Sequence, residues 1–61
     1  MKYNVYQIDL VDNATLLCTF LHDYDKAKMF RNLMYNADEK ARQEEPNEMH
    51  EMYRYVIIPI V

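Results

Sequence analysis

The sequence predicts a small α+β protein with the element order β-β-α-β, in which one helix packs on one face of a three-stranded antiparallel sheet. Two strand-like runs stand near the start of the chain, a long amphipathic segment fills its middle, and a run rich in β-branched residues follows. A chain of 61 residues is the size of one small domain, so we expect a single domain over residues 1–61.

The first two strands are predicted over residues 3–10 and 14–21, where side chains alternate and strand-forming residues are common. A three-residue loop, Val11-Asp12-Asn13, would place the apolar even positions of both strands on one face. It also puts Asn13 at a left-handed position, which Asn tolerates better than most residues. A two-residue loop at Asp12-Asn13 is the alternative, and it would pair odd positions with even ones.

The helix is predicted over residues 24–44. Asp23 is a natural N-cap, and Pro46 disfavours helical geometry at Glu45, which ends the helix near Glu44. An apolar stripe with steps of three and four residues is expected to face the sheet: Ala27, Phe30, Leu33, Met34, Ala37 and Ala41. Charged residues should mostly lie off the stripe, with Asp38 and Arg42 forming an i,i+4 pair: Lys26, Lys28, Arg31, Asp38, Glu39 and Arg42.

The last strand is predicted over residues 52–61. A helix as long as the strands can carry the chain over the first strand to its far side, so the expected strand order is 2-1-3. Pro59 agrees with an edge position for this strand, because proline has no N–H to donate to a neighbour. The alternative order, 1-2-3, would set the third strand parallel beside the second.

Alternation divides the predicted sheet into two faces. We expect the helix to cover one of them: Tyr6, Ile8, Leu10, Leu16, Cys18, Phe20, Val56, Ile58 and Ile60. The opposite face is the candidate partner-binding surface: Tyr3, Val5, Leu17, Leu21, Tyr53, Tyr55 and Ile57. Seven such side chains rival the largest apolar patches of monomers, about 300–600 Å², which predicts packing against a second copy or a foreign protein. Edge-to-edge strand pairing is another route to a dimer.

Composition disfavours enzymatic activity. The chain has no Gly and no Ser, so glycine-rich phosphate loops and serine nucleophiles are excluded. The single cysteine, Cys18, lies in an apolar run typical of a buried thiol in a reducing compartment. His50 with Glu48 and Glu51, and His22 with its neighbouring aspartates, match no strong metal motif. We therefore expect no enzyme activity, no cofactor and no metal.

The net charge is −3, and residues 36–52 hold six acidic groups against two basic ones. This balance opposes nucleic-acid binding, which depends on neutralising phosphates with Lys and Arg. A nucleic-acid binder would need a dimer that gathers Lys26, Lys28 and Arg31 on one side. The acidic segment 44–51 is an alternative contact surface for a basic partner. With no secretory or membrane-spanning run in the sequence, we expect a soluble, cytoplasmic protein.

The chain is short, acidic and rich in Met, Tyr and Asn, and a strand leads through Asp23 into the helical run Asp23-Tyr24-Asp25-Lys26-Ala27-Lys28. In these features it resembles the small orphan proteins of phages and prophages. The resemblance implies binding to a host protein. The expected function is thus a non-enzymatic protein-binding module, such as a phage-encoded inhibitor or modulator. The alternative is a self-associating, homodimeric structural or regulatory subunit.

Overall fold

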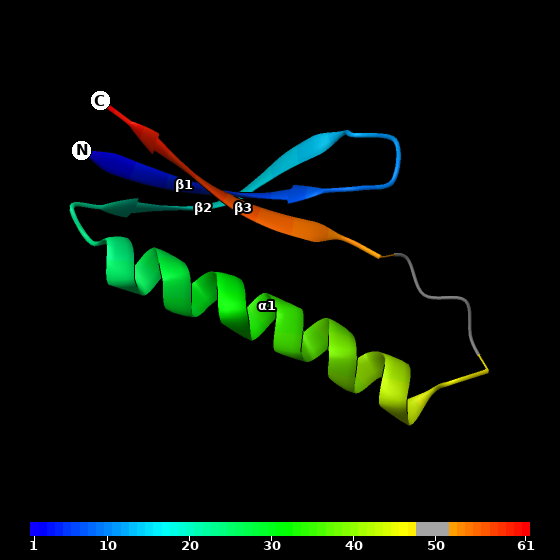
Figure 1. Ribbon diagram of the computed structural model, residues 1–61. Coiled ribbons are helices and arrows are strands. Elements are labelled where there is room, and N and C mark those ends of the chain that lie inside the picture. The colour runs from blue at the N-terminus through cyan, green and yellow to red at the C-terminus, as the bar shows by residue number, and fades with distance from the viewer. Residues whose placement is uncertain (48–51) are drawn as a thin grey trace.

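The computed structural model describes residues 1–47 and 52–61. It contains the four predicted elements in the predicted order: β1 (Lys2–Ile8), β2 (Ala14–Leu21), α1 (Tyr24–Glu44) and β3 (Arg54–Ile60). The strands form one antiparallel sheet in the order β2-β1-β3, and α1 lies against one side of it (Figure 1). The predicted α+β fold and strand order are confirmed.

α1 is long enough to run the full length of the sheet. Its 21 residues span about 31 Å, longer than a seven-residue strand of about 24 Å. The helix thus returns the chain to the end of the sheet where β2 began, and β3 pairs with the other edge of β1. Pro59 pairs with Tyr3 in β3, which is an edge strand. An edge strand bonds to a neighbouring strand on one side only, so a residue without a backbone N–H is tolerated there.

The loop between β1 and β2 is longer than predicted. The last residue of β1 pairs with Ala14, so the loop has five residues, 9–13, rather than three. The Asp9 carboxylate accepts hydrogen bonds from two backbone N–H groups of the loop, at 3.0 and 2.9 Å. The left-handed residue is Asp12, with φ 63°, and not Asn13 as predicted. Asp9 ends the strand early because its side chain bonds the backbone of the turn itself.

A β-bulge at Leu17 splits the hairpin into two parts. Near the loop the even positions of both strands share a face, as predicted, but Tyr6 pairs with Leu16 and not with Cys18 as the three-residue loop would require. Beyond the bulge Val5 pairs with Cys18, so the second half of β2 is shifted by one residue against the predicted register. An extra residue in one strand has this effect because side chains alternate with a period of two.

Both ends of α1 lie where the sequence predicts them. The Asp23 carboxylate accepts a hydrogen bond from the Lys26 backbone N–H at 3.0 Å, as an N-cap does. At the other end the Glu45 N–H donates to the Ala41 carbonyl at 3.0 Å. Pro46 follows directly and cannot continue the helical ladder.

On β1, β3 and the first half of β2 the helix covers the face opposite to the predicted one, whereas Cys18 and Phe20, which were predicted to lie under the helix, do lie on its side. Val5 is fully buried and Tyr55 is only 3% exposed, and both lie on the helix-covered side. Three pairs of aromatic rings, with centroids 5.0–5.8 Å apart, join sheet to helix: Tyr3 with Tyr24, Phe20 with Phe30, and Tyr55 with Tyr35. The prediction compared only how many apolar side chains each face holds. The two faces are similar in this respect, so the comparison does not identify the face that the helix covers. Contact between rings favours the face that holds the sheet's Tyr3, Phe20 and Tyr55.

The inner stripe of α1 is also rotated relative to the prediction. Ala27 is fully buried, but half of the six predicted stripe residues are exposed: Leu33, Ala37 and Ala41. Asp38 and Arg42, predicted to lie off the stripe, are half-buried instead. The helix diverges from the sheet toward its C-terminal end (Figure 1), so long polar side chains bridge the wider separation there.

Candidate protein-binding surface

Four of the seven predicted partner-binding residues lie on the helix-covered face: Tyr3, Val5, Tyr55 and Ile57. Val5 and Tyr55 are buried, and the other two are half-buried. The prediction that these side chains point outward is wrong. Their grouping on one face is right, because Val5 pairs with Ile57 across β1 and β3. The error lies in the choice of the face that the helix covers.

The other three predicted residues do not complete a surface. Leu17 is half-buried at the bulge, and Leu21 is exposed at the end of β2. Tyr53 is half-buried just before β3. The structure therefore does not gather the seven residues on one exposed face.

Tyr55 fastens β3 to α1. Its hydroxyl donates to the Asp38 carboxylate at 2.7 Å and accepts a hydrogen bond from the Gln7 amide at 3.4 Å. The Tyr35 hydroxyl accepts from the Tyr55 backbone N–H at 3.0 Å and donates to its carbonyl at 3.4 Å. The rings of Tyr35 and Tyr55 are perpendicular, with centroids 5.0 Å apart. Sequence reasoning missed Tyr35 and Asp38 because neither belongs to the apolar periodicity of the helix.

The pKa of Tyr55 is raised above its ordinary value of 10.0. Burial is the main cause because it penalises the charged phenolate, and the hydrogen bond to Asp38 adds to the shift. The Gln7 amide acts in the opposite direction. Since the folded pKa exceeds the unfolded one, the stability that this group contributes is complete below pH 10 and is lost as pH rises through the folded pKa.

We therefore expect the free energy of unfolding to fall with rising pH above 10 more steeply in the wild type than in Tyr55→Phe. Urea unfolding at a series of fixed pH values, followed by far-UV circular dichroism, measures both slopes. Parallel curves for the two proteins over the alkaline range would contradict the assigned environment of the Tyr55 hydroxyl.

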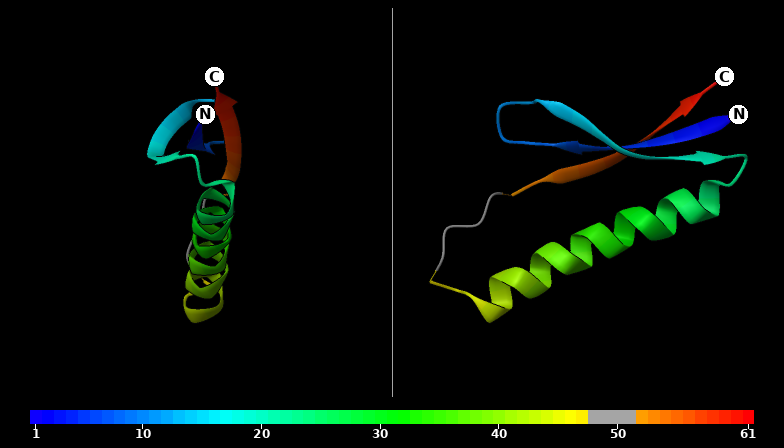
Figure 2. Two further views of the ribbon diagram at one scale, coloured as in Figure 1. Left: turned by 90° about the vertical axis from the view of Figure 1, so that its left-hand side faces the viewer. Right: turned by 180° about the vertical axis from the view of Figure 1, so that it is seen from behind.

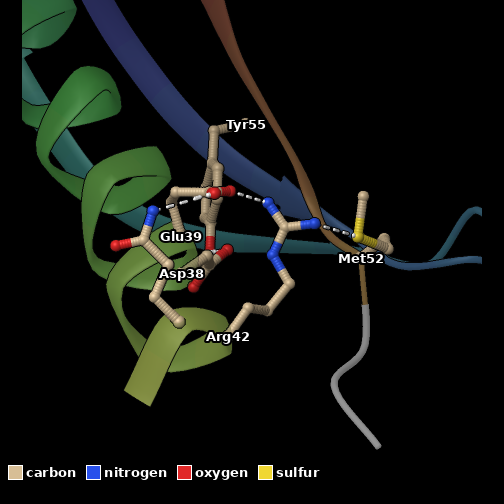
Figure 3. Close-up of polar contacts among 6 residues, drawn as sticks. Asp38, Glu39, Arg42, Met52 and Tyr55 are labelled. Carbon is tan, nitrogen blue, oxygen red and sulfur yellow. Dashed lines mark hydrogen bonds and ion pairs between the residues drawn. The ribbon is translucent and has the colours of Figure 1, made fainter. Parts of the chain in front are cut away.

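A small hollow lies beside this contact, between α1 and the segment that enters β3. It measures about 80 Å³ and is lined by Tyr35, Asp38, Arg42, Met52 and Tyr53. Arg42, predicted to pair with Asp38, instead contacts Glu39 and donates to the Met52 sulfur at 3.0 Å (Figure 3). Sites for small molecules usually enclose about 300–1,000 Å³, so this hollow is too small to be one.

One face of the sheet is left uncovered by α1, which lies on the opposite side of the strands (Figure 2). We call it the open face. All three strands contribute its apolar side chains: Tyr6, Ile8, Ala14, Leu16, Leu21, Val56, Ile58 and Ile60. The four that come from the strand ends and edges are 40–62% exposed: Leu16, Leu21, Ile58 and Ile60. Most of these residues were predicted to lie under the helix. The structure instead leaves them uncovered, and the helix covers the other apolar face.

The polar groups at the centre of the open face bond to one another. The Thr19 hydroxyl donates to the side-chain amide oxygen (Oδ1) of Asn4 at 2.7 Å, across the β1–β2 pair. The Asn4 amide in turn donates to the Tyr6 hydroxyl at 3.3 Å. Polar groups that already have partners cost less to remove from water than unpaired ones, so this part of the face can be covered by an apolar surface.

The charges of the open face lie at its two ends. Lys2 pairs with Ile60 at one end of the sheet, and Arg54 pairs with Ile8 at the other. Arg54 also forms an ion pair with Asp12 of the loop at 3.0 Å. No strand position on this face holds Asp or Glu. A polar rim around a core without charges is the usual plan of a protein–protein interface.

Residues 1–47 and 52–61 also bear on metal sites and membrane spans. No group of three His, Cys, Asp or Glu side chains in this part of the chain lies close enough to hold a metal ion. The candidate ligands Glu48, His50 and Glu51 lie outside the described residues. Among the helices described, none is long and apolar enough to cross a membrane.

Comparisons with protein-family models, with curated proteins and with solved structures find no match to this chain, and no family is assigned to it.

Proposed function

We propose that this chain is a small non-enzymatic protein-binding module that acts through the open face of its sheet. The observation that supports it most directly is an apolar surface drawn from all three strands, with four large side chains 40–62% exposed. Surfaces of this kind on small proteins mark contact sites for other proteins, because water-exposed apolar area gains free energy when a partner covers it.

The charge pattern favours a protein over a nucleic acid as the partner. The chain has a net charge of −3, and the two cations of the open face stand at opposite ends of the sheet. Phosphate binding needs several Lys and Arg side chains on one surface. The small volume of the hollow beside Tyr55 likewise gives little support to a small-molecule ligand.

The proposed partner of an inhibitor or modulator is a host protein, as the resemblance to small phage and prophage proteins implies. The acidic segment 44–51 is the second candidate contact surface. Glu44 and Glu45 are exposed on it, whereas residues 48–51 lie outside the described part of the chain. The proposal rests mainly on the open face and less on the acidic segment, because every strand position of the open face lies within the described residues.

The test compares three tagged proteins in a nuclease-treated lysate of the source organism: wild type, Ile58→Glu on the open face, and Leu33→Glu on the outer side of α1. Both positions are exposed and apolar, so the two variants are matched in chemistry. We expect specific proteins to be retained by wild type and Leu33→Glu and lost from Ile58→Glu, with similar melting temperatures. Binding through the open face is ruled out if Ile58→Glu changes neither the proteins retained nor the oligomeric mass.

Self-association is the second candidate function, in a structural or regulatory subunit. The specific observation in its favour is that no strand position of the open face holds a carboxylate, although the chain as a whole is acidic. Two copies can therefore meet there without placing carboxylates opposite each other.

A further inference from the structure

We propose that the occupant of the open face is a second copy of this chain, which packs face to face to form a two-fold symmetric dimer. The dimer rests on the proposed use of the open face for protein contact, and it assigns that face to the second candidate function, self-association, rather than to a foreign protein. Three properties of the face carry it: the area left uncovered, the internal pairing of its polar groups, and the position of its charges.

The exposed area of the single chain exceeds what a monomer of its size should have. The chain exposes 4824 Å², whereas a folded monomer of 7.4 kDa exposes about 4,200 Å². The excess is about 600 Å² over the whole chain, and a standard stable interface removes at least about 600 Å² from each partner. The area that the chain leaves uncovered is therefore what a small dimer needs.

The central polar side chains of the open face form hydrogen bonds within the chain, so a partner needs to supply few hydrogen bonds to them. The Thr19–Asn4–Tyr6 contacts satisfy its central polar atoms within one chain, at 2.7 and 3.3 Å. The remaining central positions are aliphatic, among them Leu16, Val56 and Ile58. A second apolar sheet face suits such a surface, because each of the central polar side chains Asn4, Tyr6 and Thr19 already has a hydrogen-bond partner.

The charges are also compatible with self-pairing. A two-fold interface brings each residue of one copy against the same patch of the other, so an acidic residue near its centre would meet its own kind. The open face has Lys2 and Arg54 at opposite ends and no carboxylate at any strand position between them. The outer side of α1 differs, because Lys26, Lys40 and Glu44 are exposed along the helix that carries Met29 and Leu33.

The resulting dimer has four layers, with the two sheets inside and one helix on each outer side. Figure 2 shows that α1 leaves the far side of the sheet free along the whole length of the strands. Two sheets packed in this way lie about 10 Å apart with their strands about 30° from parallel. Tyr6, on the central strand, then stands inside the interface.

Sedimentation equilibrium of the untagged wild-type protein tests the proposal at concentrations up to about 100 µM, where weak dimers of this interface size are populated. We expect the mass of a dimer. Ile58→Glu should weaken dimerisation by about a hundredfold or more, because each copy then brings an unpaired carboxylate into an apolar interface. Leu33→Glu, on the outer side of α1, should leave the dimer unchanged. Leu16→Lys tests the same face from β2, in case Ile58→Glu impairs folding.

Each outcome decides the matter. Dimer loss in Ile58→Glu and Leu16→Lys but not in Leu33→Glu supports the face-to-face dimer. A wild-type monomer over the whole range overturns it, and so does a dimer that only Leu33→Glu dissociates or that no variant dissociates. A monomer whose open face still captures a foreign protein from lysate overturns the dimer alone. A monomer that captures nothing through this face overturns the proposed function as well.

Discussion

Replacing Tyr55 by alanine should lower the free energy of unfolding by about 3–5 kcal/mol, the range found when large buried aromatic side chains are truncated. A single core in a chain of this size seldom supplies more than about 3–5 kcal/mol in total. We therefore expect Tyr55→Ala to be largely unfolded at 25 °C, as a loss of cooperative thermal unfolding in circular dichroism would record. The effect is large because Tyr55 is one of three fully or nearly buried apolar residues among those described, with Val5 and Ala27.

Two further variants separate the parts played by the ring and the hydroxyl of Tyr55. Tyr55→Phe keeps the perpendicular packing on Tyr35 but removes the hydrogen bonds to Asp38 and Gln7. It should cost about 1–3 kcal/mol, because Asp38 loses its 2.7 Å donor. Ile58→Ala is the matched control on the opposite face of the same strand, where the side chain is 43% exposed, and it should cost less than Tyr55→Ala. Equal losses in Tyr55→Ala and Ile58→Ala would contradict the orientation of β3.

Local sequence signals predicted the elements of this fold well. The ends of α1 follow from Asp23 and Pro46, which act on their immediate neighbours and depend little on the rest of the chain. The strand order follows from the length of that helix and from Pro59, which suits an edge strand. The helix ends depend on residues a few positions away, and the strand order depends on the length of the connecting segment. Local signals and segment lengths can both be read from a sequence.

The orientation of the sheet could not be predicted in this way. Both faces of the sheet are apolar, so alternation alone does not say which of them the helix covers. The bulge at Leu17 adds a second difficulty, because it moves Cys18 onto the side of Val5 without any mark in the alternation of β2. The helix-covered face is settled by contacts between distant residues, such as Tyr35 with Tyr55. Tyr3, Val5, Tyr55 and Ile57 were consequently predicted to be uncovered, whereas they lie on the helix-covered face.

The three alanines of the predicted helical stripe also show that apolar periodicity alone does not identify the residues that contact the sheet. They provide a direct test of this point. Ala27, Ala37 and Ala41 look equivalent in the sequence, since all fall on the apolar period. In the structure Ala27 is fully buried, whereas Ala37 and Ala41 are exposed where α1 diverges from the sheet. A small side chain at position 27 lets the helix lie close to the sheet at its N-terminal half.

Ala27→Leu should therefore destabilise the fold by about 1–3 kcal/mol, the usual cost of forcing extra methylene groups into a packed contact. Ala41→Leu is the matched control, because it adds the same atoms to the same helix at an exposed position, and Leu and Ala have similar helix propensities. We expect its free energy of unfolding to stay within about 0.5 kcal/mol of the wild type. Urea unfolding of the three proteins, with the slope checked for two-state behaviour, measures the difference. If both substitutions destabilise the chain equally, α1 packs evenly along the sheet, and the inner stripe is the one that the apolar period predicts. If Ala27→Leu alone does so, the close contact is confined to the first half of the helix, and the exposed alanines belong to its outer side.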